Sequence, residues 1–112
     1  MDYFSYKGGI LHAEDASIQE IAKEVGTPFY VYSTATLRRH FDLLESALSG
    51  TDHLICYAVK AASNQAILKT LANFGAGMDV VSGGEYKRAR EAGVEGSQIV
   101  FSGVGKTVAE MK

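Results

Sequence analysis

The N-terminal part of the chain changes from a two-residue to a helical spacing of apolar positions. Residues 3–12 alternate loosely around Gly8-Gly9, which predicts a short hairpin whose turn uses positive φ angles. Apolar residues then recur on one helical face from Ser17 until Gly26, where we expect the helix to stop. Ser17 and Glu20 have the spacing of a capping box, which supports a helix start at this point.

A short strand and a longer helix are predicted next. Pro28 favours an extended backbone, so the apolar residues 29–32 predict a strand. Residues from 34 to about 48 carry apolar side chains at helical spacing, and Gly50 ends the pattern. The apolar residues that recur on this helix are Leu37, Phe41, Leu44 and Leu48. We therefore place a division of the chain near Ser33.

From residue 54 onward, strand-like and helix-like segments alternate. The predicted strands are residues 54–59, 78–81 and 98–101, and the predicted helices are residues 64–74 and 84–92. A further helix is expected to begin near Thr107. The regular repeat of about 20–25 residues predicts parallel βαβ crossovers and therefore an α/β fold.

The three predicted strands look apolar on both faces, and the predicted helices are too few to cover them. We therefore interpret the chain as the N-terminal part of a larger α/β protein, a (β/α)8 barrel of the TIM type, which usually needs about 250 residues. In such barrels the reactive groups lie at the carboxyl ends of the strands. The three strand ends here carry Lys60, Asp79 and Lys106.

These candidate residues each have a chemical and a structural interpretation. Lys60 ends the apolar run LICYAVKAA, so either its ammonium group reaches solvent or the site needs an uncharged amine. Asp79 has a similar alternative, a carboxylate that only accepts hydrogen bonds. Ser82 and Glu85 form a second capping-box pattern, so Glu85 needs no chemical role. Lys106 lies in GVGKT, which lacks the first glycine of a P-loop, and we expect its amine to be hydrated in a flexible turn.

Composition narrows the class of protein without indicating a reaction. The 112 residues carry a formal net charge of −2 and are 46% hydrophobic, which is ordinary for a soluble domain. We expect no nucleic-acid partner, because there is no basic excess, and no membrane partner, because no apolar run reaches about 18 residues. The N-terminus lacks a signal-peptide pattern, so we expect a cytoplasmic protein. Cys56 is the one cysteine, and the three histidines have no ligand spacing, so we predict no disulfide and no metal site.

Three motifs together resemble a known enzyme family. YAVKA (57–61), GMDVVSGGE (77–85) and FSGVGKT (101–107) are similar to the N-terminal part of diaminopimelate decarboxylases. These are pyridoxal 5′-phosphate enzymes that share a barrel with alanine racemase and ornithine decarboxylase. The segment GTPFYVYS (26–33) also resembles the usual lead-in of the family, so the similarity covers nearly the whole chain.

The resemblance implies a cofactor site that uses Lys60, Asp79 and Glu85. In the family the lysine of the YAVKA motif binds pyridoxal phosphate through a Schiff base, which assigns Lys60 a catalytic and cofactor-binding role. The family also places Asp79 close to this lysine, as a second catalytic residue, and Glu85 near the cofactor. The motif usually continues YAVKAN, and Ala62 stands where the asparagine is expected, which puts the rigidity of this loop in question.

The implied reaction is the decarboxylation of meso-2,6-diaminopimelate to L-lysine and CO2, the final step of lysine biosynthesis. Two alternatives remain open: a decarboxylase of ornithine, arginine or carboxynorspermidine, and a non-catalytic single-barrel carrier of pyridoxal phosphate. The resemblance also implies that residues 1–33 belong with a second, β-rich domain and that residues 34–112 are an incomplete cofactor-binding barrel. We expect the complete protein to be a homodimer and the 112-residue chain alone to be inactive.

Overall fold

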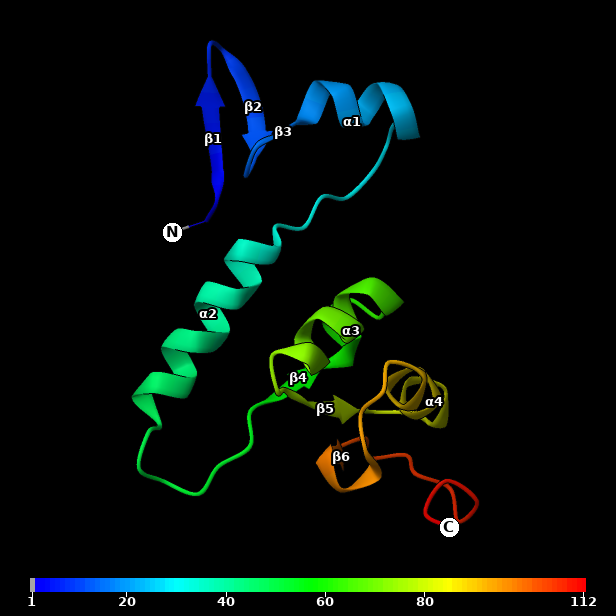
Figure 1. Ribbon diagram of the computed structural model, residues 1–112. Helices are drawn as coiled ribbons and strands as arrows, with labels where there is room; N and C mark the ends of the chain where they lie inside the picture. The colour runs from blue at the N-terminus through cyan, green and yellow to red at the C-terminus, as the bar shows by residue number, and fades with distance from the viewer. Residues whose placement is uncertain (1) are drawn as a thin grey trace. The chain divides into compact units, whose positions relative to one another are not determined.

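A computed structural model describes residues 2–112, which form two compact units, one that ends at Leu44 and one that spans Glu45–Lys112. Each unit has a three-stranded sheet (Figure 1). The first sheet is antiparallel and contains β1 (Phe4–Lys7), β2 (Ile10–Ala13) and β3 (Ala16–Ser17). The second is parallel and contains β4 (Cys56–Ala58), β5 (Gly77–Val80) and β6 (Ile99–Phe101). Helices beside a parallel sheet confirm the predicted α/β class.

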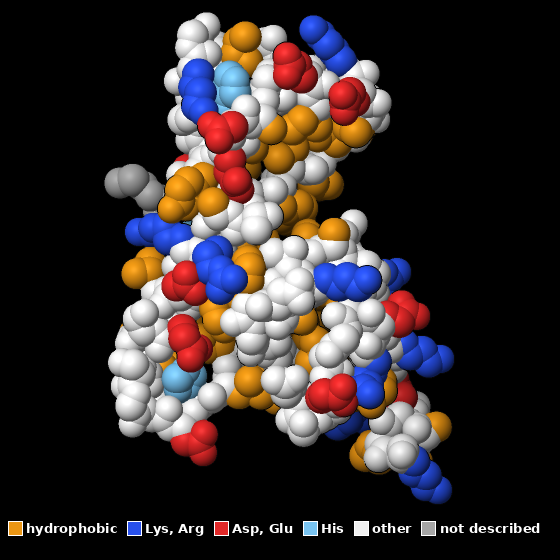
Figure 2. Space-filling view, in the orientation of Figure 1, with side chains coloured by type: hydrophobic (Ala, Val, Ile, Leu, Met, Phe, Trp, Pro, Cys, Tyr) orange, Lys and Arg blue, Asp and Glu red, His pale blue; other side chains and the backbone are white. Residues whose placement is uncertain are grey.

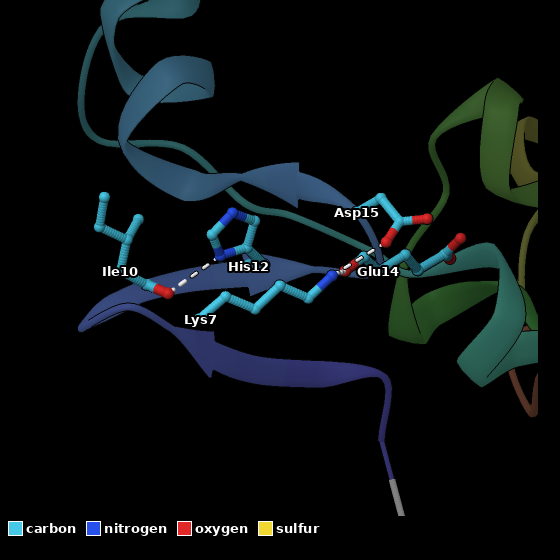
Figure 3. A network of polar contacts seen from close by, with 5 residues as sticks. All are labelled: Lys7, Ile10, His12, Glu14 and Asp15. Atoms are coloured by element: carbon cyan, nitrogen blue, oxygen red, sulfur yellow. Dashed lines mark hydrogen bonds and ion pairs between the residues drawn. The ribbon is translucent and has the colours of Figure 1, made fainter.

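The N-terminal hairpin forms where the alternating pattern predicts it. Gly8 and Gly9 make its turn with φ angles of 59° and 82°, which side chains other than glycine rarely adopt. Lys7 Nζ reaches the turn at the other end of β2, where it donates to Glu14 O (3.0 Å) and Asp15 Oδ1 (2.9 Å) (Figure 3). The hydrogen bond from Lys7, and then its charge, lower the pKa of the Asp15 carboxyl group.

The predicted helix after the hairpin is confirmed as α1 (Ile18–Val25). Ser17 Oγ accepts a hydrogen bond from Glu20 N at 3.4 Å, as the capping pattern predicts, and Gly26 ends the helix with a φ of 80°.

Glu14 connects the turn after β2 to the start of α2 (Thr34–Ala47). Its Oε1 accepts hydrogen bonds from Ser33 Oγ (2.8 Å) and from Ala35 N (2.9 Å), while Ser33 Oγ accepts from Thr36 N (3.0 Å). These donors, first the Ala35 amide and then the Ser33 hydroxyl, lower the pKa of Glu14. Glu14 Oε1 and Ser33 Oγ therefore bind the N–H groups of Ala35 and Thr36, which the first turn of a helix leaves without backbone partners.

The predicted helix 34–48 is confirmed as α2, in which Leu37 and Phe41 are half-buried and Leu44 is 48% exposed. Two sequence-based expectations are wrong. Within residues 2–112 no strand pairs with residues 29–32, and Tyr30 is 92% exposed. Thr107 begins a turn rather than a helix, with Met111 N bonded to Thr107 O at 3.2 Å. The spacing of apolar residues shows which side of a segment could be buried. Whether that side is buried, or a strand is paired, depends on a neighbouring element that the spacing does not specify.

The core of the second unit lies between one sheet face and two helices. Helices α3 (Gln65–Asn73) and α4 (Gly83–Glu91) flank the sheet (Figure 1), and α4 contacts β5. Both helices are confirmed close to their predicted bounds. The largest fully buried side chains are Val59, Leu68, Met78 and Val80. Because side chains alternate along a strand, Asp79 lies on the face opposite Met78 and Val80.

That opposite face of the sheet is poorly covered. The register aligns Asp79 with Ala58 on β4 and with Val100 on β6, so these residues share the face. Val100 is 50% exposed, and Leu54, just before β4, is 45% exposed. The predicted strand 54–59, expected to be buried on both faces, is therefore shorter and half-buried.

None of the helices in residues 2–112 has the length and hydropathy of a membrane-spanning segment. Basic and acidic side chains are interspersed over the face visible in Figure 2.

Candidate cofactor site

The carboxyl ends of the three parallel strands meet at one edge of the second sheet. The strands pair in the order β4-β5-β6, with Ala58 aligned to Asp79 and Val80 aligned to Phe101. Lys60 follows Ala58 by two residues, so its backbone emerges at the same edge as Asp79. The sequence prediction that these strand ends come together is confirmed for Lys60 and Asp79.

Lys60 lies in a 3-10 turn, Val59–Ala61, directly after β4. Val59 is fully buried, whereas Lys60 is exposed. The structure thus agrees with the interpretation in which the ammonium group reaches solvent at the strand end. Burial of Val59 anchors the turn that presents the amine.

Asp79 contributes a carboxylate oxygen without a hydrogen-bond donor. Its Oδ1 is buried and has no hydrogen-bond partner in residues 2–112, and no ion pair there joins it to Lys60. Removing such an oxygen from water without a donor costs free energy, so its presence indicates a place for a donor. Burial, and to a smaller extent the charge of Asp79, raise the pKa of the Cys56 thiol. The thiol is therefore a poor nucleophile, as a structural cysteine would be.

Glu85 has a structural role at the end of β5. Its Oε2 accepts a hydrogen bond from Val81 N at 2.8 Å, and Ser82 Oγ accepts one from Glu85 N at 3.2 Å. Ser82 is thus confirmed as the N-cap of α4. The Glu85 carboxylate binds the N–H group of Val81, one residue before the N-cap. Glu85 thereby fixes the turn that leads from Asp79 into α4.

The loop after β6 is held by Lys106 and by a close backbone approach. Lys106 Nζ donates to Gly103 O (2.7 Å) and Phe101 O (3.1 Å) and lies 5.0 Å from the centre of the Phe101 ring. Lys106 is exposed, as expected for a hydrated amine, but the expectation of a flexible turn is wrong, because its Nζ bonds to two carbonyl groups of the loop. Gly103 is buried against the end of β5, where a Cβ would lie 2.5 Å from Val81 O.

Three side chains bond to the segment after Lys60, in which Ala62 stands where the family resemblance leads us to expect asparagine. Tyr57 Oη donates to Ala62 O (3.3 Å), and Arg88 Nη1 donates to Ser63 O (3.2 Å). Asn64 Oδ1 accepts from Ala66 N (2.9 Å) and caps α3. Sequence reasoning missed both Tyr57, which binds a carbonyl five residues away, and Arg88, because no local pattern links a helix residue to a loop 25 positions away.

The arrangement combines an accessible primary amine with a buried carboxylate oxygen. A primary amine can bind an aldehyde, and a carboxylate can accept a proton or orient an ammonium group. Within residues 2–112 no three His, Cys, Asp or Glu side chains are placed to hold a metal ion. The amine of Lys60 and the carboxylate of Asp79 are the groups that fit an organic aldehyde cofactor.

Comparisons with known proteins give the same indication. Residues 34–112 match the pyridoxal-dependent decarboxylase family, in its pyridoxal binding domain. A diaminopimelate decarboxylase of Vibrio cholerae is 53% identical over 100% of this chain and 27% of its own length. The structure resembles diaminopimelate decarboxylase from M. jannaschii in complex with L-lysine (TM-score 0.86, 34% identity, 98% of this chain, 27% of that one). It also resembles lysine decarboxylase from Selenomonas ruminantium (TM-score 0.78, 28% identity, 100% of this chain, 28% of that one). The chain spans about a quarter of the length of the curated relatives it matches.

Proposed function

The chain belongs to the pyridoxal-dependent decarboxylase family, and we propose that it is part of an enzyme that converts meso-2,6-diaminopimelate to L-lysine and CO2. The observation that carries this proposal is the exposed amine of Lys60 at the same sheet edge as the buried, unpartnered Asp79 Oδ1. The 53% identity to a diaminopimelate decarboxylase supports the choice of substrate.

The residues present fit pyridoxal 5′-phosphate, which Lys60 would hold through its amine, with Asp79 and Glu85 beside it. When bound, this cofactor stabilises the negative charge that loss of CO2 leaves on the substrate carbon. The amine of Lys60, when free, can transfer a proton at Nζ. Asp79 Oδ1, which has no donor within residues 2–112, can accept a hydrogen bond from a neighbouring amine.

We infer that residues 34–112 are the first strand-helix units of a (β/α)8 barrel and that residues 1–33 belong with a second, β-rich domain. Three parallel strands in sequential order, with helices on one face, are what the start of a barrel requires. The uncovered face, with Asp79 and Val100, then corresponds to the barrel interior. The family match begins at residue 34, which supports the division. We also propose that the complete protein is a cytoplasmic homodimer with a small amino-acid substrate.

A lysine decarboxylase activity is the second candidate, because the fold also resembles such an enzyme at 28% identity. The two candidates are easily separated, since L-lysine is the product of the first reaction and the substrate of the second. The complete protein should release CO2 from meso-diaminopimelate and not from L-lysine or ornithine. Faster turnover of L-lysine or ornithine would contradict the proposed substrate.

The role of Lys60 is tested by trapping the cofactor on the complete protein. Borohydride reduction should attach the cofactor to the peptide that contains Lys60 and leave Lys106 unlabelled, since Lys106 is bonded to two carbonyl groups. Lys60→Ala should lower turnover about 10²-fold or more. Lys69→Ala, which removes an exposed amine on α3, is the matched control and should retain both label and turnover. A label on any lysine other than Lys60 would overturn the assignment.

A further inference from the structure

We propose that Arg88 is a positioning residue for Lys60, acting through the backbone that follows the lysine. The inference rests on the proposed function, because it concerns the amine that would hold the cofactor. Arg88 Nη1 donates to Ser63 O at 3.2 Å, and Ser63 lies three residues after Lys60. The bond comes from α4, an element that is remote in sequence from the lysine.

The segment from Lys60 to α3 depends on such side-chain bonds. The 3-10 turn ends at Ala61, and Ala62 is extended, with φ −161° and ψ 112°. Ala62 O accepts a bond of 3.3 Å from Tyr57 Oη, a neutral donor, and the next carbonyl, that of Ser63, accepts from the guanidinium group of Arg88. Hydrogen bonds with a charged donor are stronger than neutral ones, so Arg88 should contribute most to the order of this segment.

A second hydrogen bond joins the same two parts of the chain, and here the donor lies on the side of α3 and the acceptor on α4. Gln65 Nε2, from the first residue of α3, donates to Arg88 O at 3.1 Å and lies 3.4 Å from Glu91 Oε2. The side chain of each residue therefore binds the backbone on the other side: Arg88 binds Ser63, and Gln65 binds Arg88. Such reciprocal bonds resist both separation and sliding of the two segments.

The link joins the two strand ends that form the site. Helix α4 starts three residues after β5 ends, and its first turn is fixed to Val81 by Glu85. Arg88 lies one turn further along the same helix. The bond from Arg88 to Ser63 therefore ties the backbone after Lys60 to the element that follows Asp79, and it sets how the amine and the carboxylate are placed relative to each other.

Arg90 provides a control on the same helix. Its Nη1 donates to Val94 O (2.8 Å) and to Glu95 Oε2 (3.1 Å), at the end of α4 away from the Lys60 segment. Both arginines are exposed, carry the same charge and bind a backbone carbonyl. Arg88→Gln and Arg90→Gln thus remove equivalent groups, and only the first removes a bond to the segment after Lys60.

The experiment uses the complete protein, first without cofactor. Hydrogen exchange measured by mass spectrometry over residues 60–64 should be about tenfold faster in Arg88→Gln and unchanged in Arg90→Gln. With pyridoxal phosphate bound, Arg88→Gln should lower kcat about tenfold with little change in KM, because the amine is misplaced while the substrate contacts remain. Arg88→Lys, which keeps a charged donor, should recover part of the loss.

Two outcomes would overturn the proposal. One is equal hydrogen exchange over residues 60–64 in the two glutamine variants. The other is a loss of kcat in Arg88→Gln that matches its loss of folded protein. Failure of the proposed function gives a different result: the wild-type protein would then carry no reducible label on Lys60. The exchange experiment needs no cofactor, so it decides the role of Arg88 in either case.

Discussion

Two glycines in the loop after β6 have opposite surroundings, which makes them a matched test of how tightly this loop packs. At Gly103 a Cβ would lie 2.5 Å from Val81 O and 2.9 Å from the Phe101 ring, whereas at Gly105 it would meet nothing within 4 Å. Gly103→Ala should therefore lower the free energy of unfolding by about 1–3 kcal/mol, because a backbone carbonyl must move. Gly105→Ala should leave it unchanged or raise it by about 0.5 kcal/mol. Urea unfolding of the complete protein measures both, and similar values for the two variants would contradict the close approach.

The residues that we propose to react and the residues that hold them in place differ in how far the sequence predicts them. Lys60 and Asp79 are predictable, because Lys60 follows one apolar strand and Asp79 lies near the carboxyl end of the next, and these ends must meet in a parallel sheet. The sequence does not predict the bond from Arg88 to Ser63 or the bonds of Lys106, because they depend on the path of loops. A charged side chain at the surface has many equally good acceptors nearby.

Glu14 joins two elements, the turn after β2 and the start of α2, through a titratable group. Its pKa is lowered in the folded chain, so its stabilising effect is complete above the ordinary pKa of glutamate and is lost as the pH falls through the lowered value. The Ala35 amide, which donates to Glu14 Oε1, should report this loss as a shift of its NMR signal at acidic pH. Glu14→Gln should abolish the shift. The Ala66 amide donates to the amide oxygen of Asn64, which does not titrate there, and should stay constant. A constant Ala35 signal in the wild-type protein would argue against the contact.

The sequence predicts an element correctly where the residues that form it are neighbours in the chain. The hairpin turn at Gly8 and Gly9 and the caps at Ser17 and Ser82 involve neighbours in sequence, and all three are confirmed. Residues 29–32 (FYVY) are richer than β4 (CYA) in side chains that favour strands, yet of these two segments β4 alone has a pairing partner within residues 2–112. A strand is defined by its neighbour, which composition does not specify.

The whole chain exposes the sheet face that the proposed barrel would enclose. Leu54 and Val100 are 45% and 50% exposed on or beside this face, and the edges of a short parallel sheet offer unpaired backbone groups. A face of this kind promotes association in water. In the longer protein that we propose, the remaining strands would cover it.

Expression of residues 1–112 alone should therefore give a product that self-associates and binds a hydrophobic dye, while the complete protein should bind little dye. The double variant Leu54→Ser, Val100→Ser should reduce the association of the isolated chain, since it makes the exposed sheet face polar. Val104→Ser is the control, because Val104 is 107% exposed but lies in the loop beyond β6, outside the sheet face. Size-exclusion chromatography with light scattering measures the association state. A monomeric, cooperatively unfolding 112-residue product would contradict the incomplete barrel, and an equal effect of Val104→Ser would show that general hydrophobicity, and not this sheet face, drives association.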